Sequence, residues 1–203
     1  MASKKKTKKK SAKKSTKSAK RSKKKPAKKS AKKRAKNAGA TVTLGGNPVA
    51  VSGKLPAVGK SLPKFSLTTS TLQEVGNKDL TGKRVIFNIF PSIDTPTCAT
   101  STRRFNEIAS TLQNTDVYCV SADLPFAQGR FCGSEGLSNV KTASSFRSGF
   151  GAAFGVNLAS GVLKGVLARA IVVADENGKV LHTELVGEIA NEPNYDAAVN
   201  SLR

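Results

Sequence analysis

The sequence is poor in the residues that build metal centres and disulfide scaffolds. It has one histidine, His182, and three cysteines among 203 residues. The cysteines form no C-x-x-C pair, and they are too few for a disulfide-stapled secreted domain. Because the lone histidine lies inside an alternating strand pattern, we expect it to be structural, and a Cys and His metal cluster is unsupported. We therefore expect no metal ion and no cofactor.

Long apolar runs are also missing. The chain has no stretch of about 18 apolar residues, so no transmembrane span is predicted. The basic start is not followed by the apolar core of about 7–15 residues that a secretory signal requires. Together with the retained thiols, this leads us to expect a cytoplasmic protein.

Acidic residues are absent from the first 37 positions, which contain 18 lysines and two arginines. The formal net charge of the chain is +22, whereas the residues after this segment include 15 basic and 13 acidic ones. Like charges repel, and the segment has almost no apolar surface to bury. We therefore predict a disordered basic tail over residues 1–39 and one folded domain over residues 40–203.

The tail repeats short Ala-Lys-Lys units, such as Ser11-Ala12-Lys13-Lys14 and Ser30-Ala31-Lys32-Lys33. In composition it resembles the lysine-rich tails of linker histones and bacterial histone-like proteins. Such a segment binds phosphate backbones by counterion release and without sequence preference. Non-specific contact with DNA or RNA through residues 4–36 is therefore predicted, and DNA contact would place the protein at the nucleoid. A solubilising or targeting extension and an anionic membrane surface are the alternatives.

The strongest chemical signal in the folded part is Cys98. The apolar run over residues 85–90 predicts a buried strand that Pro91 ends, and the following periodicity predicts a helix over about 98–112. Cys98 would then lie in the first helical turn, where free backbone N–H groups and the helix dipole favour a thiolate. Thr95, three residues earlier, can point its hydroxyl toward the same place as the Cys98 sulfur. A buried structural cysteine is the alternative.

The remaining pattern predicts an α/β domain. A second buried strand over residues 117–122 implies a right-handed crossover to a parallel neighbour, and it makes Cys119 a packed thiol. Hairpins are expected over residues 41–51 and 169–186. The other expected elements are a short strand at 65–67, helices at about 124–132, 145–154 and 195–202, a flexible segment at 133–136 and a loop at 157–168. This order fits a thioredoxin-like sheet with an extra N-terminal β-hairpin.

Several stretches match one protein family closely. They are residues 88–95 with Cys98, residues 121–128, Arg130-Phe131-Cys132-Gly133, Leu163-Lys164-Gly165 and Ala168-Arg169-Ala170. On these motifs, residues 41–203 resemble the bacterial thiol peroxidases, the atypical two-cysteine branch of the peroxiredoxins. The tail lies outside the resemblance, and Val162 stands where the family is expected to have proline.

The resemblance implies a thiol peroxidase acting on hydrogen peroxide and organic hydroperoxides. Cys98 would be the peroxidatic nucleophile, whose thiolate attacks a peroxide oxygen and becomes a sulfenic acid. Thr95 would hydrogen-bond the thiolate and the peroxide, and Arg169 would hold the negative charge. Pro91 would shield the sulfenic acid. Cys132, which on spacing alone is equally a structural thiol, would form the resolving intramolecular disulfide with Cys98.

The resemblance also implies that thioredoxin reduces this disulfide and that the protein is a homodimer. Two other functions stay open. One is a general disulfide oxidoreductase, against which the missing C-x-x-C pair argues. The other is a chromatin-associated nucleic-acid-binding protein with an inactive domain, against which the full set of site residues argues. The resemblance to peroxidases and the basic tail are both explained by an active peroxidase that its tail holds on nucleic acid.

Overall fold

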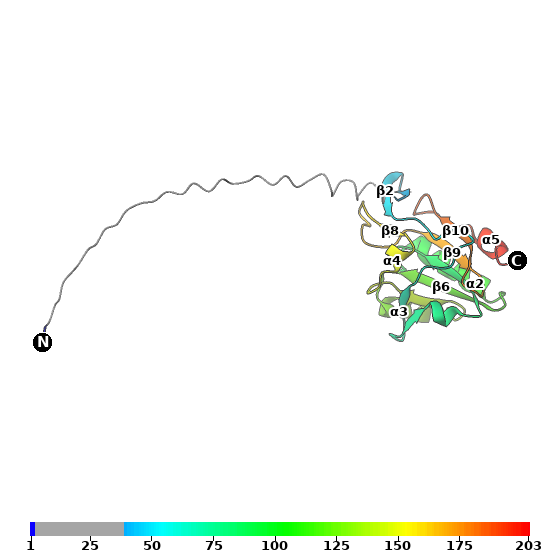
Figure 1. Cartoon of the computed structure of the whole chain (residues 1–203), viewed down its shortest axis with the longest axis horizontal. Helices are drawn as coiled ribbons and strands as arrows, with labels where there is room; N and C mark the ends of the chain where they lie inside the picture. Colours follow the sequence, from blue (N-terminus) through cyan, green and yellow to red (C-terminus); the bar gives the residue numbers. More distant parts are fainter. Residues whose placement is uncertain (3–38) are drawn as a thin grey trace, which may run out of the picture.

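The computed structural model describes residues 1–2 and 39–203 (Figure 1). The predicted disorder of the tail concerns residues 3–38, which lie outside the described residues. The strands are β1 (Thr41–Leu44), β2 (Asn47–Ser52), β3 (Ser66–Thr69), β4 (Glu74–Gly76), β5 (Arg84–Ile89), β6 (Thr115–Ser121), β7 (Lys141–Ser144), β8 (Asn157–Leu158), β9 (Ala170–Ala174) and β10 (Val180–Leu185). The helices are the 3-10 turn η2 (Asn77–Leu80), α2 (Pro96–Ala109), α3 (Pro125–Glu135), α4 (Phe150–Ala153) and α5 (Tyr195–Asn200).

The strands form a large mixed sheet and a small antiparallel one. The large sheet has the order β10-β9-β5-β6-β7-β3-β4, and the small sheet has the order β1-β2-β8. In the large sheet β5 is parallel to β6 and antiparallel to β9. Because α2 connects β5 to β6, the predicted crossover to a parallel strand is confirmed. Both predicted hairpins form, as β1 with β2 and as β9 with β10.

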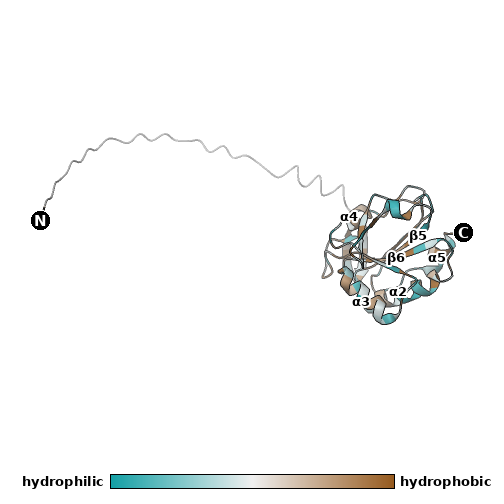
Figure 2. Cartoon of the chain, turned by 90° about the horizontal axis from the view of Figure 1, so that it is seen from below, coloured by the Kyte–Doolittle hydropathy of each residue, from teal (hydrophilic) through white to brown (hydrophobic). Residues whose placement is uncertain are grey.

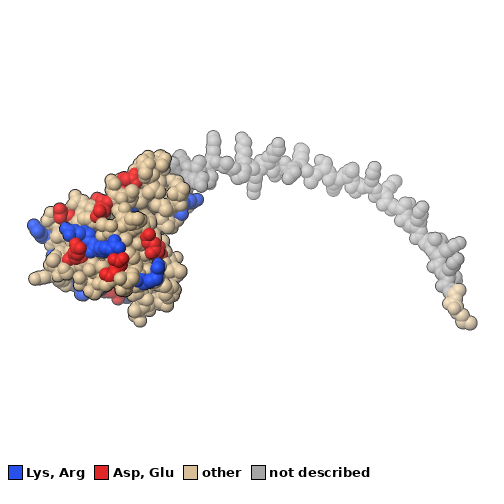
Figure 3. Space-filling model, turned by 180° about the vertical axis from the view of Figure 1, so that it is seen from behind, with Lys and Arg blue, Asp and Glu red and all other residues tan. Residues whose placement is uncertain are grey.

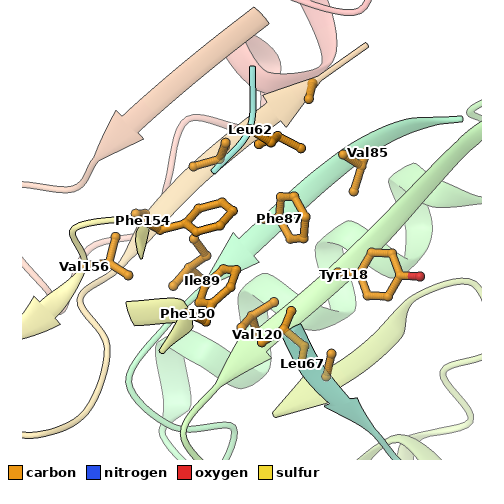
Figure 4. Close-up of a cluster of buried hydrophobic side chains, with 14 of the residues drawn as sticks. Leu62, Leu67, Val85, Phe87, Ile89, Tyr118, Val120, Phe150, Phe154 and Val156 are labelled. Atoms are coloured by element: carbon orange, nitrogen blue, oxygen red, sulfur yellow. The ribbon is translucent and has the colours of Figure 1, made fainter. Parts of the chain in front are cut away.

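The two faces of the large sheet bury separate apolar layers. On one face, the Phe87 ring lies 5.5 Å from that of Phe154 and 6.0 Å from that of Phe150, measured between centroids (Figure 4). The other face is covered by α2 and α5, which lie on the same side of β5 and β6 (Figure 2). Phe105 of α2 is fully buried there. Burying one such aromatic side chain stabilises a fold by about 1.5–3 kcal/mol, so both layers hold β5 in place.

The structure corrects several expectations about local elements. The segment 133–136, expected to be flexible, instead completes α3, and Gly136 ends that helix in the left-handed conformation with φ 66°. The helix expected over 145–154 is reduced to the four residues of α4, because its N-cap is Gly149 and the Ser145 N–H donates instead to the Ser121 carbonyl oxygen. The loop expected over 157–168 begins with β8, which pairs with β2.

Within the described chain, no helix has the length and apolarity needed to cross a bilayer. Among the same residues, His, Cys, Asp and Glu side chains nowhere gather in threes as potential metal ligands.

Candidate active site

Cys98 is fully buried in the first turn of α2, as the sequence predicts. The helix starts there because Pro96, at its first position, has a fixed φ and no N–H to leave unpaired. Thr95 is the N-cap residue and has an extended backbone, with φ −98° and ψ 145°. Its side chain does not cap the helix. Instead, its hydroxyl Oγ1 lies 2.8 Å from Cys98 Sγ and 3.1 Å from the Ser92 carbonyl oxygen.

The Thr95 hydroxyl has one proton and two acceptors within reach, so it can serve only one of them at a time. When Cys98 is a thiolate, the hydroxyl donates to the sulfur. When Cys98 is a thiol, the S–H can donate to the hydroxyl oxygen, which then donates to Ser92. The site can therefore hold either protonation state of the cysteine without leaving the hydroxyl unpaired.

Arg169 brings a positive charge to the same sulfur. It lies directly before β9 and is 1% exposed, and its Nη2 is 3.4 Å from Cys98 Sγ. Its Nε donates to the Ile189 carbonyl oxygen at 2.9 Å, whereas its Nη1 is buried with no partner among the described residues. A buried guanidinium is costly unless an anion or strong acceptors face it. The geometry therefore favours a negative charge at Cys98 and leaves the two N–H groups of Nη1 available to a ligand.

Pro91 is buried two residues after the end of β5, in the loop that leads to Cys98. Asp123, which sequence reasoning did not single out, holds this loop. One carboxylate oxygen accepts from the Ser92 hydroxyl at 2.8 Å, and the other accepts from the Ile93 N–H at 2.7 Å. Because β5 and β6 are parallel neighbours, the residues after both strands meet at one edge of the sheet. The sequence placed Asp123 directly after a predicted strand and inside the matching stretch 121–128, but gave it no role.

Cys132 lies on α3, separate from the helix of Cys98. It is half-buried, and burial raises the pKa of its thiol. Arg103 of α2 and Glu135 of α3 join the two helices by hydrogen bonds of 2.8 and 2.9 Å. The helix itself buries only Pro125 and Gln128 fully. All three cysteines are free, so this is the reduced protein with both helices formed.

Cys119 lies within β6 and is fully buried, in agreement with the prediction of a packed thiol. The Asn88 Nδ2 lies 3.6 Å from its sulfur. Burial raises the pKa of this thiol to about 12. Cys119 is therefore a neutral core residue at physiological pH.

Comparisons with known proteins extend this picture. The Redoxin family matches residues 57–199. A thiol peroxidase from Corynebacterium glutamicum is 55% identical over 157 residues, which cover 77% of this chain and 95% of that protein. A thiol peroxidase from Mycobacterium tuberculosis is 54% identical over 163 residues, covering 80% of this chain and 98% of that protein. The crystal structure of a peroxiredoxin-like protein from Aquifex aeolicus superposes with a TM-score of 0.76 at 44% identity, covering 80% of this chain and 95% of that one.

Proposed function

Because this chain belongs to the Redoxin family, we propose that it reduces peroxides at Cys98. Its similarity to the thiol peroxidases makes it a peroxiredoxin-type thiol peroxidase with a thioredoxin-like fold. One observation carries the choice of Cys98: the sulfur receives the Thr95 hydroxyl at 2.8 Å and Arg169 Nη2 at 3.4 Å. Two donors converging on one buried sulfur stabilise a thiolate, which is the nucleophilic form of cysteine.

In the proposed first step, the Cys98 thiolate attacks one peroxide oxygen. The electron pair of the O–O bond moves to the other oxygen, which takes a proton and leaves as water or an alcohol. The sulfur is oxidised to a sulfenic acid, and the peroxide is reduced. The unpartnered Arg169 Nη1 is the donor available to the oxygen on which charge develops. One such pre-aligned donor lowers a barrier by about 3–4 kcal/mol. The buried Pro91 limits access of water to the sulfenic acid.

In the proposed second step, the Cys132 thiolate attacks the sulfenic sulfur. The S–S bond forms as the S–O bond breaks, and the leaving hydroxide takes a proton and departs as water. A disulfide needs Cα atoms within about 7 Å, and here the two cysteines lie on separate, intact helices. We propose that local unwinding precedes the bond. The lightly buried α3 is the element best suited to open, and opening also removes the burial that raises the pKa of Cys132.

A Cys132→Ser variant is expected to reduce about one peroxide per chain and then stop, because its sulfenic acid has no internal thiol to meet. The measurement is peroxide consumption with thioredoxin and its reductase present. Cys119→Ser is the matched control and should continue to turn over like the wild type, since Cys119 is a neutral core thiol. Sustained thioredoxin-dependent turnover by Cys132→Ser at the wild-type rate would remove Cys132 from the resolving role.

Thioredoxin is the proposed reductant, because its thiolate can open the Cys98–Cys132 disulfide by exchange once α3 is displaced. The alternative of a general disulfide oxidoreductase is less favoured. Its usual C-x-x-C pair is missing, and a buried arginine on the sulfur suits attack on a small peroxide better than attack on a bulky protein disulfide.

We also propose a homodimer. Leu124 and Phe126 at the start of α3 are 50% and 64% exposed, and Phe146 beyond β7 is 41% exposed. The Ser145 N–H donates to the Ser121 carbonyl oxygen at 2.9 Å, which keeps these two loops adjacent at the active-site edge. Sedimentation equilibrium at micromolar concentration should give the mass of two chains, and Phe126→Glu should lower it toward one. A monomeric wild type over the whole concentration range would refute the dimer.

For the tail, residues 1–39, we propose non-specific binding of nucleic acid through residues 4–36, with the enzyme placed in the cytoplasm at the nucleoid. Its cations have no acidic partners within the segment, whereas the domain surface in Figure 3 carries interspersed charges of both signs. The domain alone is therefore a poor ligand for DNA. An inactive chromatin-bound domain is not favoured, because the Thr95 hydroxyl and the Arg169 guanidinium both contact the Cys98 sulfur, and a binding role has no use for that arrangement.

A further inference from the structure

Glu188 lies in the segment between β10 and α5, and its carboxylate accepts four hydrogen bonds. Three donors come from the β1–β2 hairpin: the Thr43 hydroxyl at 2.8 Å, the Gly45 N–H at 3.0 Å and the Gly46 N–H at 3.1 Å. The fourth is the Ala190 N–H at 3.1 Å. These bonds, that from Gly46 above all, lower the pKa of Glu188 to about 2. The side chain is therefore a permanent anion at neutral pH.

The backbone around Glu188 is bound to the same hairpin. The Thr43 N–H donates to the Gly187 carbonyl oxygen at 2.7 Å, and the Ile189 N–H donates to the Thr43 carbonyl oxygen at 2.8 Å. Thr43 and Glu188 thus form a parallel bridge. A three-residue segment that has no strand of its own is fixed along the edge of β1.

The other side of this segment faces the active site. The Ile189 carbonyl oxygen accepts from Arg169 Nε at 2.9 Å, and the Ala190 carbonyl oxygen accepts from the Thr97 hydroxyl at 3.0 Å. Among the described residues, the Ile189 carbonyl is the only oxygen that accepts a bond from the Arg169 guanidinium. Its position therefore decides where the guanidinium points.

We infer that Glu188 is a positioning residue for peroxide reduction. By fixing residues 187–190 on the β1–β2 hairpin, it holds the Ile189 carbonyl that orients Arg169 toward Cys98. The inference rests on the proposed function of Cys98 and Arg169. It gives the N-terminal hairpin a role in catalysis, although the range matched by the Redoxin family starts only at residue 57.

Glu188→Gln in the full-length protein tests this inference. The amide keeps the shape but turns one acceptor oxygen into a donor, which opposes the hairpin N–H groups. The rate constant for Cys98 oxidation by hydrogen peroxide should fall about tenfold, less than the 10²–10³-fold typical of deleting a catalytic donor, because Arg169 is displaced and not lost. The rate constant for Cys98 alkylation by iodoacetamide at pH 7 should also fall, since a displaced cation stabilises the attacking sulfur anion less.

Glu107→Gln is the matched control, because Glu107 is an exposed carboxylate on α2 that pairs only with Arg104. It should leave the rate constants for Cys98 oxidation and for Cys98 alkylation unchanged. In an Arg169→Lys background, Glu188→Gln should cause little further loss, because both changes act through the same guanidinium. A purely structural role would lower thermal stability and move neither readout.

A folded Glu188→Gln protein that oxidises and alkylates Cys98 at the wild-type rates overturns the inference. If this variant does not fold, Thr43→Val, which removes one donor to the carboxylate, is measured in the same two assays: lower rates support the inference and unchanged rates overturn it. A wild type that consumes no peroxide would instead reject the proposed function. Because alkylation needs no peroxide, its rate constant separates these two failures.

Discussion

Replacing Cys98 by serine abolishes peroxide consumption, with an expected loss of about 10⁴-fold or more, as for other enzymes deprived of their nucleophile. A serine hydroxyl stays protonated beside Arg169, so the attacking anion is missing. Neither remaining thiol can take over, because burial raises the pKa of Cys119 to about 12 and also raises that of Cys132. The assay follows hydrogen peroxide and an alkyl hydroperoxide with a thioredoxin reducing system.

Cys119→Ser serves as the control for this loss, since it removes a thiol that lies outside the proposed chemistry. It should retain wild-type turnover with both peroxides. If Cys98→Ser kept activity within tenfold of the wild type, another group would be the nucleophile. The roles proposed for Thr95 and Arg169 would then be wrong as well, because both depend on Cys98.

Removal of residues 1–38 should weaken binding to double-stranded DNA by about 10³-fold or more at low salt. This is the loss of affinity expected when a protein gives up its contacts with several phosphates. The segment holds 20 basic residues, all within positions 1–37, whereas the rest of the chain has a net charge of only +2. The full-length protein should also lose affinity steeply as salt rises, while the truncated protein should show a shallow slope. Fluorescence anisotropy with DNA of unrelated sequences measures both effects.

A full-length variant with its tail lysines changed to glutamine is the matched control, because it keeps the length of the chain and removes the charge. It should bind like the truncated protein. Equal affinity of the full-length and truncated proteins would exclude the tail as the binding segment. The combined role further predicts that the full-length enzyme protects DNA from peroxide better than an equal amount of truncated enzyme, and equal protection would reject it.

The parts of the site that lie close together in sequence were predictable from local patterns. Thr95 and Cys98 share one helix start, and their contact follows from a three-residue spacing after a buried strand. Arg169 is 71 residues away from Cys98. Its place beside the sulfur depends on the antiparallel pairing of β9 with β5, so only the family resemblance pointed to it.

The residues that support the site were not predictable in this way. Asp123 and Glu188 are acidic residues in connecting segments, and their partners lie on other parts of the chain. The length of α3 was also missed, because Gly133 and Gly136 suggested an early end. The helix continues to Glu135, where Arg103 of α2 binds it, and Gly136 is its C-cap. Tertiary contacts decided each of these features.

Disulfide mapping by mass spectrometry after one equivalent of hydrogen peroxide tests the central claim most directly. The full-length wild type should yield a peptide pair joined through Cys98 and Cys132, with Cys119 recovered as a free thiol. A disulfide that contains Cys119, or a protein that consumes the peroxide and keeps Cys98 and Cys132 as free thiols, would contradict the proposed mechanism.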